Sequence, residues 1–180
     1  QRALPAGQVT QAEALLFIAA ALAAFFASVY QLPELCRRLW AVVLAPMALY
    51  SLTKRFTWAC HFVLGLCLGL APPGAWVATT NTLPPAGIWM LAAGVMFWTA
   101  GFDILYSCQD YEFDRQEGLH SVPVRFGIAP ALLATKLLHA LCVVFFGLMG
   151  FFFSLGAVFY TGLGVIACFL WYENSIVRPD

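Results

Sequence analysis

Charged side chains are scarce in this sequence. Lysine and arginine together number nine, aspartate and glutamate nine, and charged residues make up only 10% of the 180-residue chain. Ordinary soluble domains carry about 25% charged and about 45–50% apolar residues. Here 62% of the residues are hydrophobic and the mean hydropathy is +0.83. So few charges cannot cover the surface of a globule of this size, which excludes a soluble domain.

Several sequence signals of other protein classes are also missing. The formal net charge is zero, so there is no basic surface for nucleic acid. The six cysteines are scattered and contain no CxxC pair, which argues against a disulfide framework or a zinc site. There is no glycine-rich phosphate loop, nucleophile elbow or HExxH motif. The first ten residues are polar and lack the apolar core of a signal peptide, so we expect that sequence upstream is missing.

Long apolar runs take the place of these features. A spanning helix needs about 20 mostly apolar residues, with a range of about 17–25. The pattern predicts an all-α fold, a polytopic transmembrane helix bundle that forms a single membrane domain over residues 1–180. Its six spans are expected at residues 12–30, 39–53, 56–71 and 87–106, with two more in 126–171, divided near 150–156.

The third span is expected to stop at a Pro-Pro-Gly sequence, residues 72–74. The apolar segment 75–86 then either extends that helix after a kink or lies in the membrane interface. The second span is short, but Arg38 and Lys54 at its ends can snorkel to the membrane surface.

The distribution of basic residues predicts the orientation. Six crossings place both termini, residues 51–55 and the loop 103–125 on one side of the membrane. That side holds six basic residues, and the other side holds two. The six are Arg2, Lys54, Arg55, Arg115, Arg125 and Arg178, and the two are Arg37 and Arg38. Because cytoplasmic loops carry an excess of lysine and arginine, the loop 103–125 is expected to face the cytoplasm.

That loop carries the clearest chemical signal. The segment 103–118 holds five of the nine acidic residues. On a continuous helix ending at Gly118, the side chains of Asp110, Asp114, Tyr106 and Glu117 would lie within about 60° of Asp103. Like charges on one helix face repel each other, so such a stripe needs a positive partner. The alternative is a solvated connection between spans, but Asp103 and Tyr106 lie inside a predicted span, where an ionisable group is a functional candidate.

The residue types favour a magnesium site for a diphosphate. Mg²⁺ prefers oxygen ligands and typically joins one or two carboxylates to substrate phosphates. Asp110 and Asp114 are the expected metal ligands, and Lys54, Arg55 and Arg115 supply positive charge on the same side of the membrane. The alternative for Tyr50 and Lys54 is an interfacial anchor.

The three histidines lie in different surroundings along the chain. His61 and His139 lie in apolar segments and are expected to be buried and hydrogen-bonded. His120 lies in the loop and is either a ligand or solvated.

The loop resembles the second aspartate-rich motif of the UbiA family of intramembrane aromatic prenyltransferases. The match covers residues 103–106, 109–114 and 118–127. Residues 50–58 resemble the family's Tyr-x-x-x-Lys segment, residues 2–9 the stretch after its first aspartate motif, and residues 172–173 with 177–180 a late cytoplasmic loop. The closest similarity is to bacterial 4-hydroxybenzoate or menaquinone-pathway polyprenyltransferases.

The resemblance implies nine helices around a cavity and a Mg²⁺-dependent transferase of the bacterial inner membrane. A polyprenyl diphosphate would donate its chain to an aromatic acid in ubiquinone or menaquinone biosynthesis. Asp110 and Asp114 would hold Mg²⁺, while Lys54 and Arg115 would neutralise the leaving group. Asp103, Tyr106 and Tyr50 would line the pocket where the allylic cation meets the ring.

The sequence departs from the family at both ends. The first motif, N-D-x-x-D-x-x-x-D, is absent, and six spans are expected where the family has nine. We expect a fragment that lacks two helices before Gln1 and about one after Asp180. Alternatives are a transporter or channel that uses the acidic stripe, and an inactive fragment that binds quinone lipids. Transfer to haem, chlorophyllide or naphthoate also stays open.

Overall fold

The computed structural model describes residue 7 and residues 9–177, and these form nine helices and no strand. Arg2, Arg178 and the outermost parts of the two terminal resemblances lie outside the described residues. The helices are α1 (Gln11–Gln31), α2 (Glu34–Thr53), α3 (Cys60–Gly69), α4 (Ala71–Thr80), α5 (Ala86–Gln109), α6 (Tyr111–Gln116), α7 (Val122–Phe126), α8 (Ile128–Phe152) and α9 (Ala157–Ile176).

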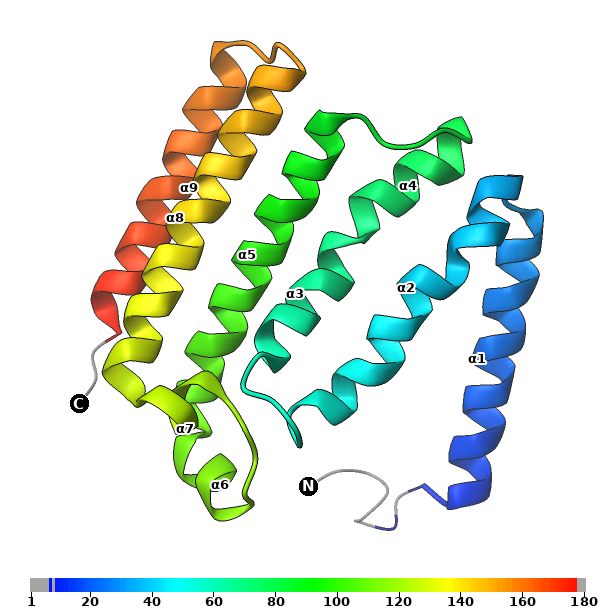
Figure 1. Cartoon of the computed structure of the whole chain (residues 1–180), viewed down its shortest axis with the longest axis horizontal. Helices are drawn as coiled ribbons and strands as arrows, with labels where there is room; N and C mark the ends of the chain where they lie inside the picture. Colours follow the sequence, from blue (N-terminus) through cyan, green and yellow to red (C-terminus); the bar gives the residue numbers. More distant parts are fainter. Residues whose placement is uncertain (1–6, 8, 178–180) are drawn as a thin grey trace.

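The long helices run side by side and alternate in direction (Figure 1). Helices α3 and α4 follow one another as a single unit, so six helical units cross the molecule. The ends of α2 and α5, the short helices α6 and α7, and the start of α8 gather at one end of the bundle, which we call the site end. Residues 51–55 and the loop 103–125 therefore lie at the same end of the bundle, as expected.

Five of these units are long and apolar enough to cross a membrane by length and composition. They are α1, α2, the α3–α4 unit (Cys60–Thr80), α5 and α8. The expected sixth span, α9, has 20 residues but does not belong to the five, because polar residues including Glu173 and Asn174 occupy its last turns. The division of the long apolar run near residues 150–156 is confirmed by the break between α8 and α9.

The expectation that residues 72–74 stop the third span is wrong. Only Leu70 separates α3 from α4, and the prolines lie in the first turn of α4. Proline is tolerated there because first-turn amides have no partner within the helix. The helix ends instead at Asn81, which adopts a left-handed conformation with φ of 53°. The alternative that residues 75–86 extend the span is confirmed as far as Thr80.

Helix α5 forms the centre of the bundle and packs against α3 on one side and α8 on the other. The buried core joins α5, α7 and α8 through Ala100, Ile104, Val122, Ala131 and Leu138. By contrast, α1 and α2 contain no buried residue. Their apolar side chains are exposed, for example Phe17 at 78%, which is the expected state of residues that face lipid.

Close contact between α3 and α5 depends on glycine. A Cβ atom built on Gly65 would lie 2.5 Å from the carbonyl oxygen of Met96, and one on Gly69 would lie 2.8 Å from that of Ala92. Small residues at such positions let transmembrane helices approach backbone to backbone. The two glycines therefore set the spacing between α3 and α5, two of the helices that carry the cavity residues Cys60, His61 and Asp103.

Gly65→Ala is therefore expected to destabilise the bundle by about 1–3 kcal/mol, because the new methyl group meets backbone that cannot move aside. Gly164→Ala in α9 is the matched control, since nothing lies within 4 Å of its Cβ position. Thermal unfolding of the detergent-solubilised protein measures both. Equal melting temperatures for the two variants would contradict the close α3–α5 contact.

Candidate functional site

A cavity of about 410 Å³ opens at the site end between α2, α3 and α5. It brings together five of the predicted site residues, Tyr50, Lys54, Asp103, Tyr106 and Asp110. The remaining lining residues are Ser51, Cys60, His61 and Ser107. The cavity thus combines carboxylates, a lysine and two phenols in a chain that has few polar groups.

The expected continuous helix through residues 103–118 is wrong. Helix α5 ends at Gln109, and Asp110 lies between α5 and α6 with φ of −91° and ψ of 7°. The turn changes the direction of the chain, so Asp114 is buried while Glu117 is exposed. The expectation that the acidic helix ends at Gly118 is confirmed. Gly118 has a left-handed φ of 64°, and the amide of Leu119 donates to the carbonyl of Asp114 over 2.8 Å, as in a glycine-capped helix end.

Lys54 and Asp114 form an ion pair at this end. Lys54 Nζ lies 2.8 Å from Asp114 Oδ2, with side-chain exposures of 33% and 1%. The pair is a contact of charges rather than an aligned hydrogen bond, and neither oxygen of Asp114 accepts a hydrogen bond from the described residues. The amide of His120 donates to the carbonyl of Lys54 over 2.7 Å, which ties the α6–α7 loop to the end of α2. Asp114 therefore keeps acceptor capacity next to a cation.

Asp103 has a different partner. Its Oδ2 atom lies 2.7 Å from His61 Nδ1, and the amide of Val122 donates to His61 Nε2 over 3.2 Å. His61 is only 1% exposed, whereas the side chain of Asp103 is 29% exposed and borders the cavity. The histidine thus connects α3, α5 and α7 at the cavity wall.

The other predicted residues divide into two groups. Tyr50 and Tyr106 line the cavity, as expected. Arg55 and Arg115 are exposed and do not line it. Contact of these two arginines with a diphosphate stays a prediction.

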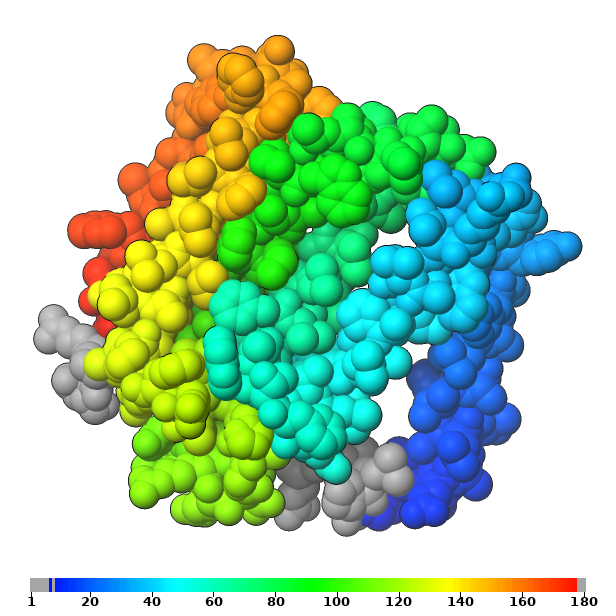
Figure 2. Space-filling model, in the orientation of Figure 1, coloured from blue at the N-terminus to red at the C-terminus, as the bar shows by residue number. Residues whose placement is uncertain are grey.

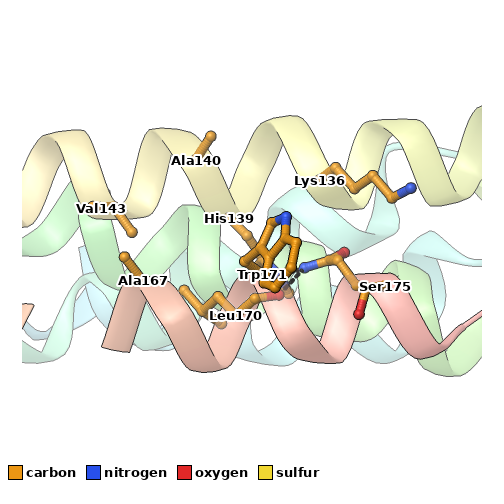
Figure 3. A pocket seen from close by; sticks show the side chains of 9 residues that line it. Lys136, His139, Ala140, Val143, Ala167, Leu170, Trp171 and Ser175 are labelled. Atoms are coloured by element: carbon orange, nitrogen blue, oxygen red, sulfur yellow. Dashed lines mark hydrogen bonds between the residues drawn. The ribbon is translucent and has the colours of Figure 1, made fainter. Parts of the chain in front are cut away.

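Sequence reasoning assigned His61 and His139 to the buried, hydrogen-bonded class, which is confirmed for both. It missed that His61 lies at the cavity, because its partner Asp103 is 42 residues away in the chain. His139 lies elsewhere, in a groove between α8 and α9 with Lys136, Trp171 and Asn174 (Figure 3). Asn174 Nδ2 lies 2.8 Å from His139 Nδ1.

A second, apolar cavity of about 440 Å³ lies between α1, α2, α4 and the start of α5. Its lining includes Trp40 and Val43 of α2, Val77 of α4 and Trp89 of α5. The surface is visibly hollowed between α2 and the α3–α4 unit (Figure 2). Val43 is seven residues from Tyr50 on the same helix, a rise of about 10 Å, so one helix carries both a polar and an apolar cavity.

Two curated proteins are similar to this chain over nearly its whole length. The chain is 31% identical over 180 residues to a 4-hydroxybenzoate octaprenyltransferase of Sodalis glossinidius (strain morsitans). That match covers 99% of this chain and 61% of that protein. It is 36% identical over 172 residues to the protein of the same name from Pseudomonas syringae pv. tomato, with 95% of this chain and 57% of that protein covered. The chain therefore spans about three fifths of the length of these curated relatives.

A solved structure is also similar. The apo structure of a UbiA homolog from Aeropyrum pernix K1 superposes with a TM-score of 0.86 at 32% sequence identity, covering 98% of this chain and 66% of that one. The profile of the UbiA prenyltransferase family matches residues 1–180, the whole chain. With its all-α membrane bundle, this chain belongs to the UbiA prenyltransferase family.

Proposed function

We propose that the protein containing this chain transfers a polyprenyl group from a polyprenyl diphosphate to an aromatic acid resembling 4-hydroxybenzoate, as part of ubiquinone biosynthesis. Family membership and the names of the relatives support this reaction class. The observation that carries the proposal is the cavity at the site end. There, Lys54 lines the cavity together with Asp103 and Asp110, and it contacts Asp114. A naphthoate acceptor in menaquinone biosynthesis is the alternative within the same chemistry.

The carboxylates have the donor chemistry that Mg²⁺ requires. Neither buried oxygen of Asp114 accepts a hydrogen bond from the described residues, and Asp110 lines the cavity that Lys54 also lines. The described part of the chain contains no group of three His, Cys, Asp or Glu side chains that could hold a metal ion without a substrate. Two carboxylates suffice when the substrate's phosphates complete the shell. Asp110 and Asp114 would hold the ion, and bound Mg²⁺ would stabilise charge on the departing diphosphate.

The residues of the chain would support bond breaking and bond making in sequence. The allylic C–O bond breaks, its electron pair leaves with the diphosphate, and the Lys54 ammonium stabilises that charge. A ring carbon of the acceptor then bonds to the allylic carbon and loses its proton. Asp103, which lines the cavity, would face the cation and accept that proton. Tyr50 and Tyr106 border the same space, and the apolar bundle limits the water that would quench the cation.

The prenyl chain needs an apolar surface beyond the reacting carbon. The apolar cavity further along α2 provides one, and the exposed faces of α1 and α2 would contact lipid. A long isoprenoid could therefore lie along α2 with its diphosphate at Lys54.

The proposed setting is the bacterial inner membrane, with the site end facing the cytoplasm. Lys54, Arg55, Arg115 and Arg125 lie at that end, and Arg37 and Arg38 lie near the start of α2 at the other. This asymmetry supports the orientation through the positive-inside rule.

Cysteine labelling in intact cells tests the orientation. Cysteine at Gly118 is expected to resist an impermeant external reagent, while cysteine at Thr82, in the exposed α4–α5 loop, is expected to react. Pro73 is unsuitable as the external marker, because it is buried in α4. The unmodified chain supplies the background of its own cysteines. External labelling at position 118 with protection at 82 would reverse the orientation.

The reaction itself is tested with the purified full-length gene product, a polyprenyl diphosphate and 4-hydroxybenzoate. Mass spectrometry is expected to detect prenylated product, its loss with EDTA and its recovery with Mg²⁺. Product formation that EDTA does not affect would contradict the metal. A cation flux into proteoliposomes without any product would favour a transporter, although no Asp or Glu lies at mid-span in the described spans.

A further inference from the structure

We infer that His61 is a positioning residue for Asp103, and that it acts as a fixed Nδ1–H donor rather than as a proton carrier. The kinetic part of this inference rests on the proposed function. The assignment of the protonated nitrogen rests on geometry alone.

The hydrogen bonds of His61 define its tautomer. The amide of Val122 donates to Nε2 over 3.2 Å, so Nε2 supplies a lone pair and carries no proton. A neutral imidazole has one N–H group, which must then be on Nδ1. Nδ1 lies 2.7 Å from Asp103 Oδ2, so the ring donates to the carboxylate. The network therefore leaves His61 with one donor and one acceptor, both used.

The surroundings prevent the ring from changing this arrangement. His61 is 1% exposed and Val122 is 5% exposed. Val122 begins α7, where first-turn amides have no partner within the helix. If Nε2 took up a proton or the ring turned over, this buried amide would lose its acceptor, and an unpaired buried donor costs about 1–3 kcal/mol. A group that must keep its acceptor nitrogen occupied is poorly suited to carry protons.

The consequence for Asp103 is a fixed carboxylate plane. Its Oδ2 atom is held by His61 from behind, and its exposed part faces the cavity. An aspartate without that bond would rotate freely about its terminal torsion, which has broad minima. Because reacting groups must be held in a near-attack geometry, the loss of this bond should lower kcat more than it raises KM.

His139 provides an internal control with the opposite tautomer. It is also buried, at 2% exposure, but it lies in the α8–α9 groove (Figure 3). Asn174 Nδ2 donates to the carbonyl of Leu170 over 2.7 Å. Because a carbonyl can only accept, this bond fixes which way the Asn174 amide group is turned. That nitrogen also donates to His139 Nδ1 over 2.8 Å, so the proton of His139 is on Nε2.

Nitrogen-15 solid-state NMR of the full-length protein in bilayers tests the tautomer directly. His61→Gln and His139→Gln assign the signals by their disappearance. The expected result is a protonated Nδ1 for His61 and a protonated Nε2 for His139. A protonated Nε2 on His61, or a doubly protonated ring at neutral pH, would overturn the inference whether or not the protein transfers prenyl groups.

Kinetics test the positioning role. His61→Ala is expected to lower kcat about 10²-fold with little change in KM, because Asp103 loses its orientation. His61→Gln should recover most of that loss, since its amide can donate to Asp103 and accept from Val122 but cannot carry a proton. His139→Gln should leave kcat unchanged. A glutamine variant as impaired as alanine, with the protein folded, would indicate proton transfer by His61 and overturn positioning. Absence of turnover in the wild type would refute the proposed function, and the NMR result would still decide the tautomer.

Discussion

Asp114→Asn is expected to lower kcat by about 10²–10³-fold, the usual cost of losing a group that stabilises charge in the transition state. Asp114 is 1% exposed, contacts Lys54 Nζ at 2.8 Å and keeps oxygens that accept no hydrogen bond from the described residues. The asparagine keeps the size of the side chain but removes the charge needed by a metal and by Lys54. Asp110→Asn should have a similar effect, because Asp110 lines the cavity that Lys54, the partner of Asp114, also lines.

The measurement is prenyl transfer by purified full-length protein at saturating Mg²⁺, with the melting temperature as a check on folding. Glu117→Gln is the matched control, since Glu117 belongs to the same acidic segment but is exposed and lies outside the cavity. It should retain activity. Retention of more than about a tenth of the wild-type rate by the folded Asp114→Asn protein would argue against metal ligation.

The second large effect is expected at Lys54. If Lys54 contacts the diphosphate as a compact charge, Lys54→Gln leaves the departing negative charge without compensation and should lower kcat about 10²-fold. Lys54→Arg should lose less, but still measurably, because the planar guanidinium differs in reach and geometry from an ammonium. The buried carboxylate of Asp114 would also pair with an arginine at position 54 in a different geometry from that of the native lysine.

Lys136→Gln separates this role from simple anchoring in the membrane. Lys136 is exposed on α8 and borders the groove between α8 and α9, away from the cavity (Figure 3). A lysine that only snorkels can be replaced by arginine without loss. Equal activity of wild type, Lys54→Arg and Lys54→Gln would reduce Lys54 to an anchor, whereas a loss at Lys136 as large as at Lys54 would indicate a general effect of charge on the bundle.

The class of fold could be predicted because apolar run length is a strong signal in a chain with so little charge. The prediction failed where local signals compete. Prolines at residues 72–73 read as a stop in sequence, yet they occupy a first turn where their missing amides cost little. The boundary between α5 and α6 was not predicted for a similar reason. Nothing in the local sequence distinguishes a turn at Asp110 from a helix that continues.

The site was predictable in its residue types and much less so in its contacts. Tyr50, Lys54, Asp103, Tyr106 and Asp110 do share one cavity. The spacing within one helix could not reveal that Asp114 turns toward Lys54, since that contact joins residues 60 positions apart. His61 was predicted to be buried, but only the packing of α3 against α5 places it beside Asp103.

Binding of a non-hydrolysable polyprenyl thiolodiphosphate to the full-length protein tests the central claim most directly, because it does not depend on turnover. The account predicts saturable, Mg²⁺-dependent binding that weakens at least about tenfold in Lys54→Gln, as expected for the loss of a charged contact, and is unchanged in Lys136→Gln. Binding of equal strength in wild type and Lys54→Gln, or binding that does not depend on Mg²⁺, would contradict a diphosphate site at the ends of α2 and α5.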